Sequence, residues 1–163
     1  MSYRFHYVFF GAPSECTEEQ QAFHDVMAEF NKEQAMPRGL LFCALTLMPN
    51  VYDKRAFQGA IFANLDMSRH LVLVLEDSWG PPARDFEKDW AYAQRCIANP
   101  ELPMKEAVIL FKAPLLPHKV DPAIVELKQN LLSNGGQHAT FENVNEFRTK
   151  LSALLSGWLA AVE

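Results

Sequence analysis

The sequence predicts a three-layer α/β fold, in which an open parallel sheet of five strands, in the order 2-1-3-4-5, carries helices on both faces. Five short runs rich in apolar residues alternate along the chain with five segments of helical periodicity. Several of these runs are apolar without alternation, as expected of strands that are covered on both faces. Parallel neighbours need crossover connections, so the alternation of strand and helix indicates a parallel sheet.

Five segments are predicted as strands because they are short and rich in apolar, β-branched or aromatic residues. In chain order they are residues 5–10, 40–47, 71–75, 107–112 and 137–141. Gly11 and Pro13 follow the first segment, and Pro49 ends the second. The third segment, LVLVL, is expected at the centre of the sheet, and the fifth has the weakest pattern.

Five segments are predicted as helices because their apolar residues recur at helical spacing. They are residues 17–36, 55–67, 86–97, 122–133 and 144–162. Thr17, followed by Gln20 three positions later, fits a capping box at the start of the first helix. Asp121 is expected to cap the fourth helix, with Pro122 at its first position and Gly135 at its end.

Composition and charge exclude several classes of function. A length of 163 residues fits one domain, expected over residues 1–163. The net charge is -5 and the basic residues are scattered, so no nucleic acid partner is expected. No window approaches the roughly 18 apolar residues of a membrane span, and no membrane association is expected. We therefore expect a cytoplasmic protein.

No metal site or cofactor is expected, because the metal-ligating residue types are scattered. The three cysteines have no paired spacing, and the five histidines fall on different segments and are expected to be structural. Cys16 lies near a helix start, where the pKa of a thiol can fall, so a reactive thiol is a further possibility.

The predicted topology places a ligand site beside the first and third strands, where the strand order reverses. Residues 11–15 and residues 76–85 form the two loops that meet there. The first loop has no G-x-G-x-x-G or P-loop pattern. Its binding candidates are Gly11 and Ser14, since N–H groups at a helix start and a hydroxyl can receive a phosphate or a ribose. Ser14 fits a turn or helix cap equally well.

The second loop supplies four more substrate-binding candidates. Asp77 and Ser78 can hydrogen-bond a sugar hydroxyl, and Gly80 lies beside them. Trp79 either stacks on a base or packs beneath the loop. Tyr92, in the following helix, either stacks on a base or lies at the surface or in an interface.

Two acids at the start of the third helix are the catalytic candidates. Glu87 and Asp89 lie on opposite flanks of an apolar face, so only one is expected to face the cleft and the other water. The residues of that face are Phe86, Trp90, Ala93 and Ile97. A carboxylate at a helix N-terminus is also favourable without any chemistry, so a structural role stays open for both acids.

Four segments carry a resemblance to a known family. They are VFFGAPSECTEEQQAF, RAFQGAIFANLD, LVLVLEDSWG and the helix that contains Glu87, Asp89 and AYA. The chain resembles the Toll/interleukin-receptor-like domains of unknown function found in bacterial signalling and defence proteins. These domains are in turn similar to nucleoside 2-deoxyribosyltransferases.

The resemblance implies a flavodoxin-like sheet and, in active relatives, cleavage or exchange of an N-glycosidic bond of a nucleoside or NAD. The acid of such relatives falls on Glu87 by the pattern of the unknown-function group. By the transferase-like pattern E-x-G-Y-A it falls on Asp89, where aspartate replaces the expected glutamate. The sequence also departs from the transferases in the loop, which has Trp79-Gly80-Pro81-Pro82 in place of small residues.

Two functions of different classes follow. The first is an N-glycosidase or nucleoside (deoxy)ribosyltransferase, in which Glu87 or Asp89 stabilises or attacks the sugar as its C–N bond breaks, without metal or cofactor. The second is a non-catalytic module that binds a nucleotide, or that interacts with a partner signalling domain or a second copy of itself.

Overall fold

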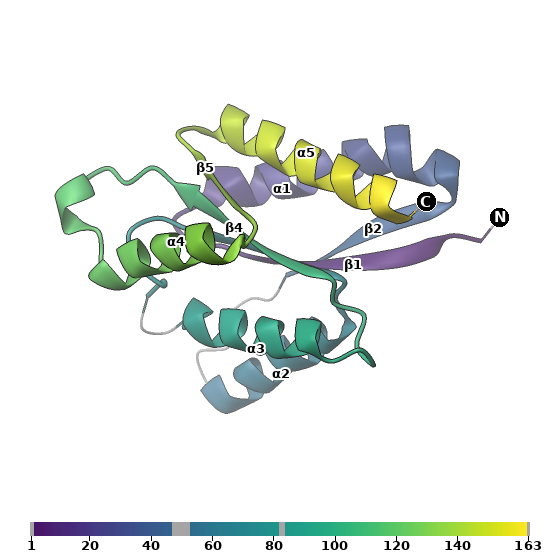
Figure 1. Ribbon diagram of the computed structural model, residues 1–163. Helices are drawn as coiled ribbons and strands as arrows, with labels where there is room; N and C mark the ends of the chain where they lie inside the picture. The colour runs from purple at the N-terminus through teal and green to yellow at the C-terminus, as the bar shows by residue number, and fades with distance from the viewer. Residues whose placement is uncertain (1, 47–52, 82–83, 163) are drawn as a thin grey trace.

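The computed structural model describes residues 2–46, 53–81 and 84–162, and within these ranges strands and helices alternate (Figure 1). The strands are β1 (Arg4–Gly11), β2 (Leu40–Leu45), β3 (His70–Leu75), β4 (Glu106–Lys112) and β5 (His138–Phe141). The α-helices are α1 (Thr17–Phe30), α2 (Lys54–Met67), α3 (Phe86–Ala98), α4 (Pro122–Asn134) and α5 (Val144–Val162). A π-helical turn (Asn31–Ala35) and a 3-10 turn (Met36–Arg38) continue α1, and a second 3-10 turn (Pro117–Lys119) precedes α4.

The predicted fold class is confirmed. All neighbouring strands pair in parallel, in the order β2-β1-β3-β4-β5. Figure 1 shows α1 and α5 on one face of the sheet and α2, α3 and α4 on the other. The chain therefore has a three-layer, flavodoxin-like α/β fold, and its strands all end at the same edge of the sheet.

The alternation of side chains along β3 builds the two halves of the core. Val72 and Val74 pack into the cluster that α1 and α5 cover, whereas Leu71, Leu73 and Leu75 pack into the cluster beneath α2, α3 and α4. All five side chains are buried, and each contributes roughly 1.5–3 kcal/mol of hydrophobic free energy. This double burial explains why the LVLVL segment is apolar at every position.

The two ends of α4 are as predicted from the sequence, whereas the start of α1 is not. The Asp121 carboxylate accepts a hydrogen bond from the Ala123 N–H, and Gly135 ends α4 at a φ of 68°. The predicted capping box at Thr17 is wrong, because Cys16 is the N-cap and makes no side-chain capping bond. The amide of Gln20 instead donates to the Pro13 carbonyl, which fixes the turn before the helix.

Strand and helix ends differ from the predictions by one to a few residues. The α-helical geometry of the first predicted helix ends after Phe30, and the chain reaches Gly39, at a φ of 73°, through the π and 3-10 turns. The predicted end of the second strand at Leu47 and its stop at Pro49 lie outside the described residues.

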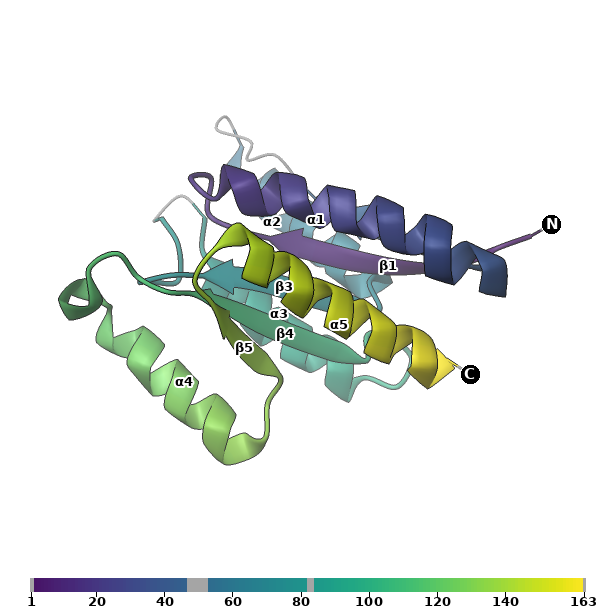
Figure 2. The same ribbon diagram turned by 90° about the horizontal axis from the view of Figure 1, so that it is seen from above.

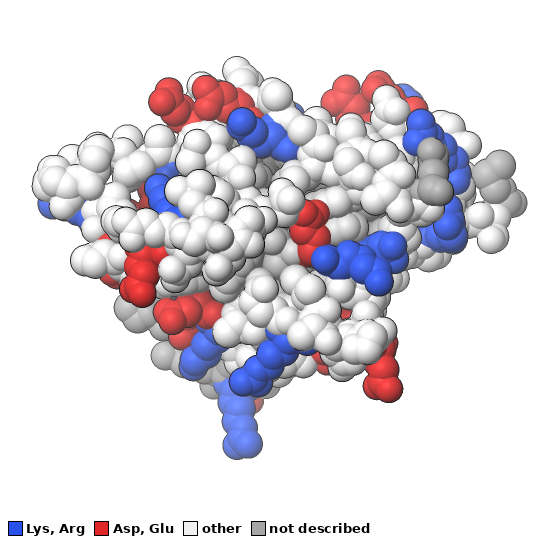
Figure 3. All heavy atoms as spheres, in the orientation of Figure 1, with Lys and Arg blue, Asp and Glu red and all other residues white. Residues whose placement is uncertain are grey.

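The described residues contain no helix that is long and apolar enough to cross a membrane. Figure 3 shows basic and acidic side chains interspersed over one face of the molecule, in keeping with the scattered charges of the sequence.

Candidate functional site

The carboxyl ends of β1 and β3 meet where the sequence predicted a ligand site. Gly11 is the last residue of β1 and pairs with Leu73 of β3. A Cβ at this position would lie 2.9 Å from Leu73 Cδ2 and 3.0 Å from Phe86 Cε1. Gly11 therefore allows the first turn of α3 to pack closely on the sheet.

An ion pair bridges this edge from α1 to β4. Lys112 Nζ lies 2.8 Å from Glu19 Oε1, and the Glu19 side chain is buried. Glu76, directly after β3, is half-buried, and burial raises its pKa. Glu15 and Asp77 add two further carboxylates to the surroundings of Glu76. The edge between β1 and β3 is thus predominantly acidic and disfavours an anionic ligand.

The predicted binding residues of the two loops do not form one cluster of free polar groups. Ser14 is exposed in the turn before α1 and does not cap that helix. Asp77 is exposed, and its carbonyl accepts from the Asp121 N–H at 2.8 Å. The Ser78 hydroxyl accepts from the Gly80 N–H at 3.2 Å, so it stabilises the loop itself.

Trp79 and Gly80 hold the loop against the start of α3. The Trp79 ring is partly buried against the core cluster that contains Phe86. This placement agrees with the second alternative from the sequence, in which Trp79 packs beneath the loop. Its carbonyl accepts from the Phe86 N–H at 3.2 Å. Gly80 has a φ of 101°, and a Cβ there would lie 2.5 Å from Phe86 Cδ2.

The buried face of α3 differs from the predicted one. The buried residues are Phe86, Asp89, Ala93 and Cys96, whereas Trp90 is half-buried and Ile97 is 36% exposed. Of the two candidate acids, Glu87 is exposed and Asp89 is completely buried. Glu87 thus faces water, as expected of one of the two acids, whereas Asp89 is enclosed in the interior and has no surface exposed to a cleft.

An arginine of the preceding loop provides the counter-charge for Asp89. Arg84 Nη2 lies 2.5 Å from Asp89 Oδ2, so the two side chains form a buried ion pair. The guanidinium also lies 4.4 Å from the centre of the Phe86 ring and 5.5 Å from that of Phe57. Burial raises the pKa of Asp89, while Arg84 and Gln58 oppose the rise.

Tyr92 joins α3 to α2 and is not free to stack on a base. Its hydroxyl donates to Asp66 Oδ1 at 2.7 Å, and its ring is stacked on Phe62 with centres 4.1 Å apart. The hydrogen bond to Asp66, followed by burial, raises the pKa of Tyr92 to about 12. The surface or interface position expected for Tyr92 is thus replaced by a contact between helices.

Cys16 lacks the lowered pKa of a reactive thiol. It is buried, and burial raises its pKa to about 12, with Glu19 adding to the rise. Across the described parts of the chain, no group of three or more histidine, cysteine or acidic side chains has the arrangement of a metal site.

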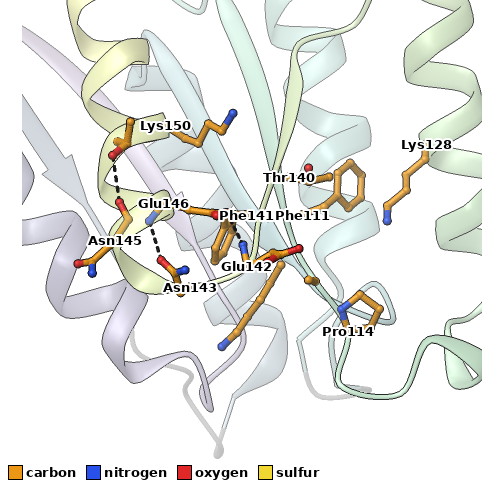
Figure 4. Close-up of a pocket in the computed structure, with 13 residues that line it drawn as sticks. Phe111, Pro114, Lys128, Thr140, Phe141, Glu142, Asn143, Asn145, Glu146 and Lys150 are labelled. Atoms are coloured by element: carbon orange, nitrogen blue, oxygen red, sulfur yellow. Dashed lines mark hydrogen bonds between the residues drawn. The ribbon is translucent and has the colours of Figure 1, made fainter.

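A pocket of about 870 Å³ lies at the carboxyl ends of β4 and β5 (Figure 4). Lys128 extends from α4 and Lys150 from α5, on the two sides of β5. Lys128 Nζ lies 4.8 Å from the centre of the Phe111 ring. Thr140 and Asn145 add polar groups to the lining. The lining also contains Lys112, which is paired with Glu19, and the carboxylates of Glu142 and Glu146. The pocket therefore presents lysines, carboxylates and hydrogen-bonding groups at the edge where α/β folds bind ligands.

This pocket was not predicted from the sequence, although one local signal for the start of α5 was present. Asn143 and Glu146 are spaced as in a capping box. The Glu146 N–H donates to Asn143 Oδ1 at 2.9 Å, and the Glu142 N–H donates to Glu146 Oε2 at 2.8 Å. These bonds fix the start of α5 beside β5, but the lysines that reach the pocket come from two separate helices.

No protein-family model and no curated protein matches the chain. Among solved structures, it is similar to the crystal structure of the general stress protein 14 from Treponema denticola in complex with FMN. The two share 12% identity with a TM-score of 0.44, over 97% of this chain and 99% of that chain. This similarity carries no argument about the function of the chain, and the resemblance to Toll/interleukin-receptor-like domains and deoxyribosyltransferases stays a prediction.

Proposed function

We propose that this chain is a non-catalytic module that binds a nucleotide, a nucleoside or NAD. The observation that supports the non-catalytic part of the proposal is the burial of Asp89 beside Arg84, which keeps this acid from contact with a substrate. Glu87, the other candidate, is exposed on α3.

The chemistry of glycosidic cleavage explains why these placements matter. As a ribosyl C–N bond breaks, positive charge develops on the sugar, and a carboxylate must lie beside the anomeric carbon to stabilise it. Asp89 has no exposed surface, and the positive charge of Arg84 cancels much of its field. In this conformation Asp89 therefore can neither reach the anomeric carbon of a substrate nor provide an uncompensated negative charge beside it.

The pocket at the carboxyl ends of β4 and β5 is the proposed binding site. Its volume of about 870 Å³ lies within the range of small-molecule pockets, roughly 300–1,000 Å³. Lys128 and Lys150 attract phosphate, and Thr140 and Asn145 can hydrogen-bond a ribose. The acidic edge between β1 and β3, in contrast, disfavours an anionic ligand.

Calorimetric titration with AMP, NAD and adenosine tests this proposal. We expect saturable binding of AMP and NAD, with Lys128→Gln and Lys150→Gln each weakening it about tenfold, as the loss of one charge-assisted contact implies. Lys32→Gln is the matched control, because Lys32 is exposed and does not line the pocket. Absence of binding, or unchanged affinity in both pocket variants, would refute the proposed site.

A second function, cleavage or exchange of an N-glycosidic bond, is favoured by the environment of Asp89. A carboxyl group whose pKa is raised by burial at a helix start is a recurrent feature of active sites. Hydrolysis would transfer the sugar to water, while the base leaves with the bonding electrons and gains a proton. Chromatography of nucleosides and NAD incubated with the protein tests it. Release of base that Asp89→Asn abolishes and Glu87→Gln preserves would establish the enzyme and overturn the non-catalytic proposal.

A further inference from the structure

A second cavity lies at the opposite, amino edge of the sheet, between the first residues of β3 and β4 and the last turns of α5. Its volume is about 250 Å³. Figure 2 shows the C-terminal end of α5 above this edge, far along the helix from the pocket at its start. The lining includes Arg69, His70, Lys105, Glu106, Trp158 and Val162.

The charged groups of this cavity leave one positive charge in excess. Arg69 and Lys105 are cationic, and neither has an ion-pair partner among residues 2–46, 53–81 and 84–162. The Glu106 carboxylate accepts a short hydrogen bond from Trp158 Nε1–H. This bond orients Glu106 toward the indole, while the two cations remain available to an anion.

The wall of the cavity contains a polar group without a partner. His70 is 3% exposed, and its ring is stacked on Trp158 with centres 3.9 Å apart. His70 Nδ1 has no hydrogen-bond partner in the described part of the chain. Buried polar atoms of this kind are uncommon and point to an interaction beyond the chain's own residues.

We propose that this cavity binds a small molecule with a single carboxylate, held between Arg69 and Lys105. The excess of one positive charge matches a monoanion, whereas a phosphate dianion would leave negative charge beside Glu106. Trp158 and Val162 provide an apolar wall for the carbon skeleton of the ligand. This site lies at the opposite edge of the sheet from the one proposed above, and its volume of about 250 Å³ is below the roughly 300–1,000 Å³ of pockets for drug-sized ligands, as suits a smaller molecule.

The indole N–H signals in a two-dimensional NMR spectrum test this site directly. The probe is sodium acetate, compared with sodium phosphate and sodium chloride at equal ionic strength. We expect acetate to shift the Trp158 signal saturably and to leave those of Trp79 and Trp90 unchanged. Trp158→Phe assigns the signal. Lys105→Gln and Arg69→Gln should each weaken acetate binding about tenfold or more.

Lys119→Gln is the matched control, because Lys119 is exposed and follows the carboxyl end of β4, at the other edge of the sheet. Equal shifts with chloride, or an unaltered acetate titration in Lys105→Gln, would overturn the proposal. Tighter binding of phosphate than of acetate would overturn the carboxylate assignment. Lys105 is exposed, so its replacement gives a readable result even if Arg69→Gln impairs folding.

Discussion

The guanidinium of Arg84 lies 2.5 Å from the carboxylate of Asp89, whose side chain has no exposed surface. This pair determines both the stability of the loop after β3 and the availability of the acid. Arg84→Gln leaves a buried carboxylate without its counter-charge. We expect the free energy of unfolding to fall by about 3–5 kcal/mol at neutral pH, measured by urea denaturation.

The pH dependence of this loss distinguishes charge from packing. Asp89 has a folded-state pKa above its ordinary value of 3.8, so the folded chain binds this proton more readily than the unfolded chain. Removing Arg84 raises the pKa further, and the penalty then grows as pH rises through that range. The loss should therefore shrink near pH 4. A double variant with Asp89→Asn should recover stability at neutral pH, and an equal loss at both pH values would contradict the assignment.

The side chain of Asn31 occupies the outer edge of β2. Its amide nitrogen donates to the Phe42 carbonyl at 2.8 Å, and its oxygen accepts from the Phe42 N–H at 2.9 Å. Asn31→Ala should cost about 1–3 kcal/mol in unfolding free energy, because two backbone groups lose their partners. Asn31→Asp should not restore it, since a carboxylate cannot donate to the carbonyl. Asn64→Ala, at an exposed hydrogen bond, should change stability by about 0.5 kcal/mol or less.

Tyr92→Phe separates the hydrogen bond between α2 and α3 from the stacking contact. The variant keeps the ring on Phe62 but removes the bond to Asp66. We expect a loss of about 1.5–3 kcal/mol in the free energy of unfolding by heat or urea, as for a hydrogen bond to a charged group. Tyr3→Phe is the control, and a similar loss there would show that the effect is not specific to the helix contact.

Gly80→Ala tests the close approach of the loop to Phe86. The new methyl group would meet the Phe86 ring at 2.5 Å, in a backbone conformation with a φ of 101°. We expect a destabilisation of about 1–3 kcal/mol. Gly59→Ala is the matched control, because nothing lies within 4 Å of the new methyl group in α2. Helix propensity predicts that this control gains about 0.5–1 kcal/mol. A tolerated Gly80→Ala would refute the packing role.

The fold was predictable because its main signals are local. The LVLVL run of β3, the Asp121 cap and the Gly135 stop each depend on a few neighbouring residues, and all were confirmed. The start of α1 was not predictable in this way. The contact between Gln20 and the Pro13 carbonyl reverses the chain before the helix, and a spacing rule for Thr17 does not detect it.

The candidate site was less predictable, because its contacts join distant segments. The apolar pattern predicted Trp90 and Ile97 on the buried face and left open which acid turns inward. The ion pair with Arg84 favours the burial of Asp89. Similarly, the pocket beside β5 depends on Lys128 and Lys150, which only the tertiary fold brings to one place. The sequence identified the loop and the acids but not their pairing.

His70 gives the last prediction, a loss of stability in mild acid. Burial, followed by the charge of Arg69, lowers the pKa of His70 from 6.5 to about 3. Below pH 6.5 the unfolded chain gains a proton that the folded chain does not bind, so the free energy of unfolding falls as pH decreases toward about 3. One such group costs about 1.4 kcal/mol per pH unit. Urea denaturation between pH 6.5 and about 5 should therefore show a loss of about 2 kcal/mol from His70.

His70→Phe retains a ring against Trp158 but cannot titrate, and it should remove this part of the loss. His24→Asn, at an exposed position on α1, should leave the pH dependence unchanged. If His70→Phe and the parent chain lose stability equally, the acid sensitivity must come from other groups, of which buried His6, with a pKa lowered to about 4, is the next to replace.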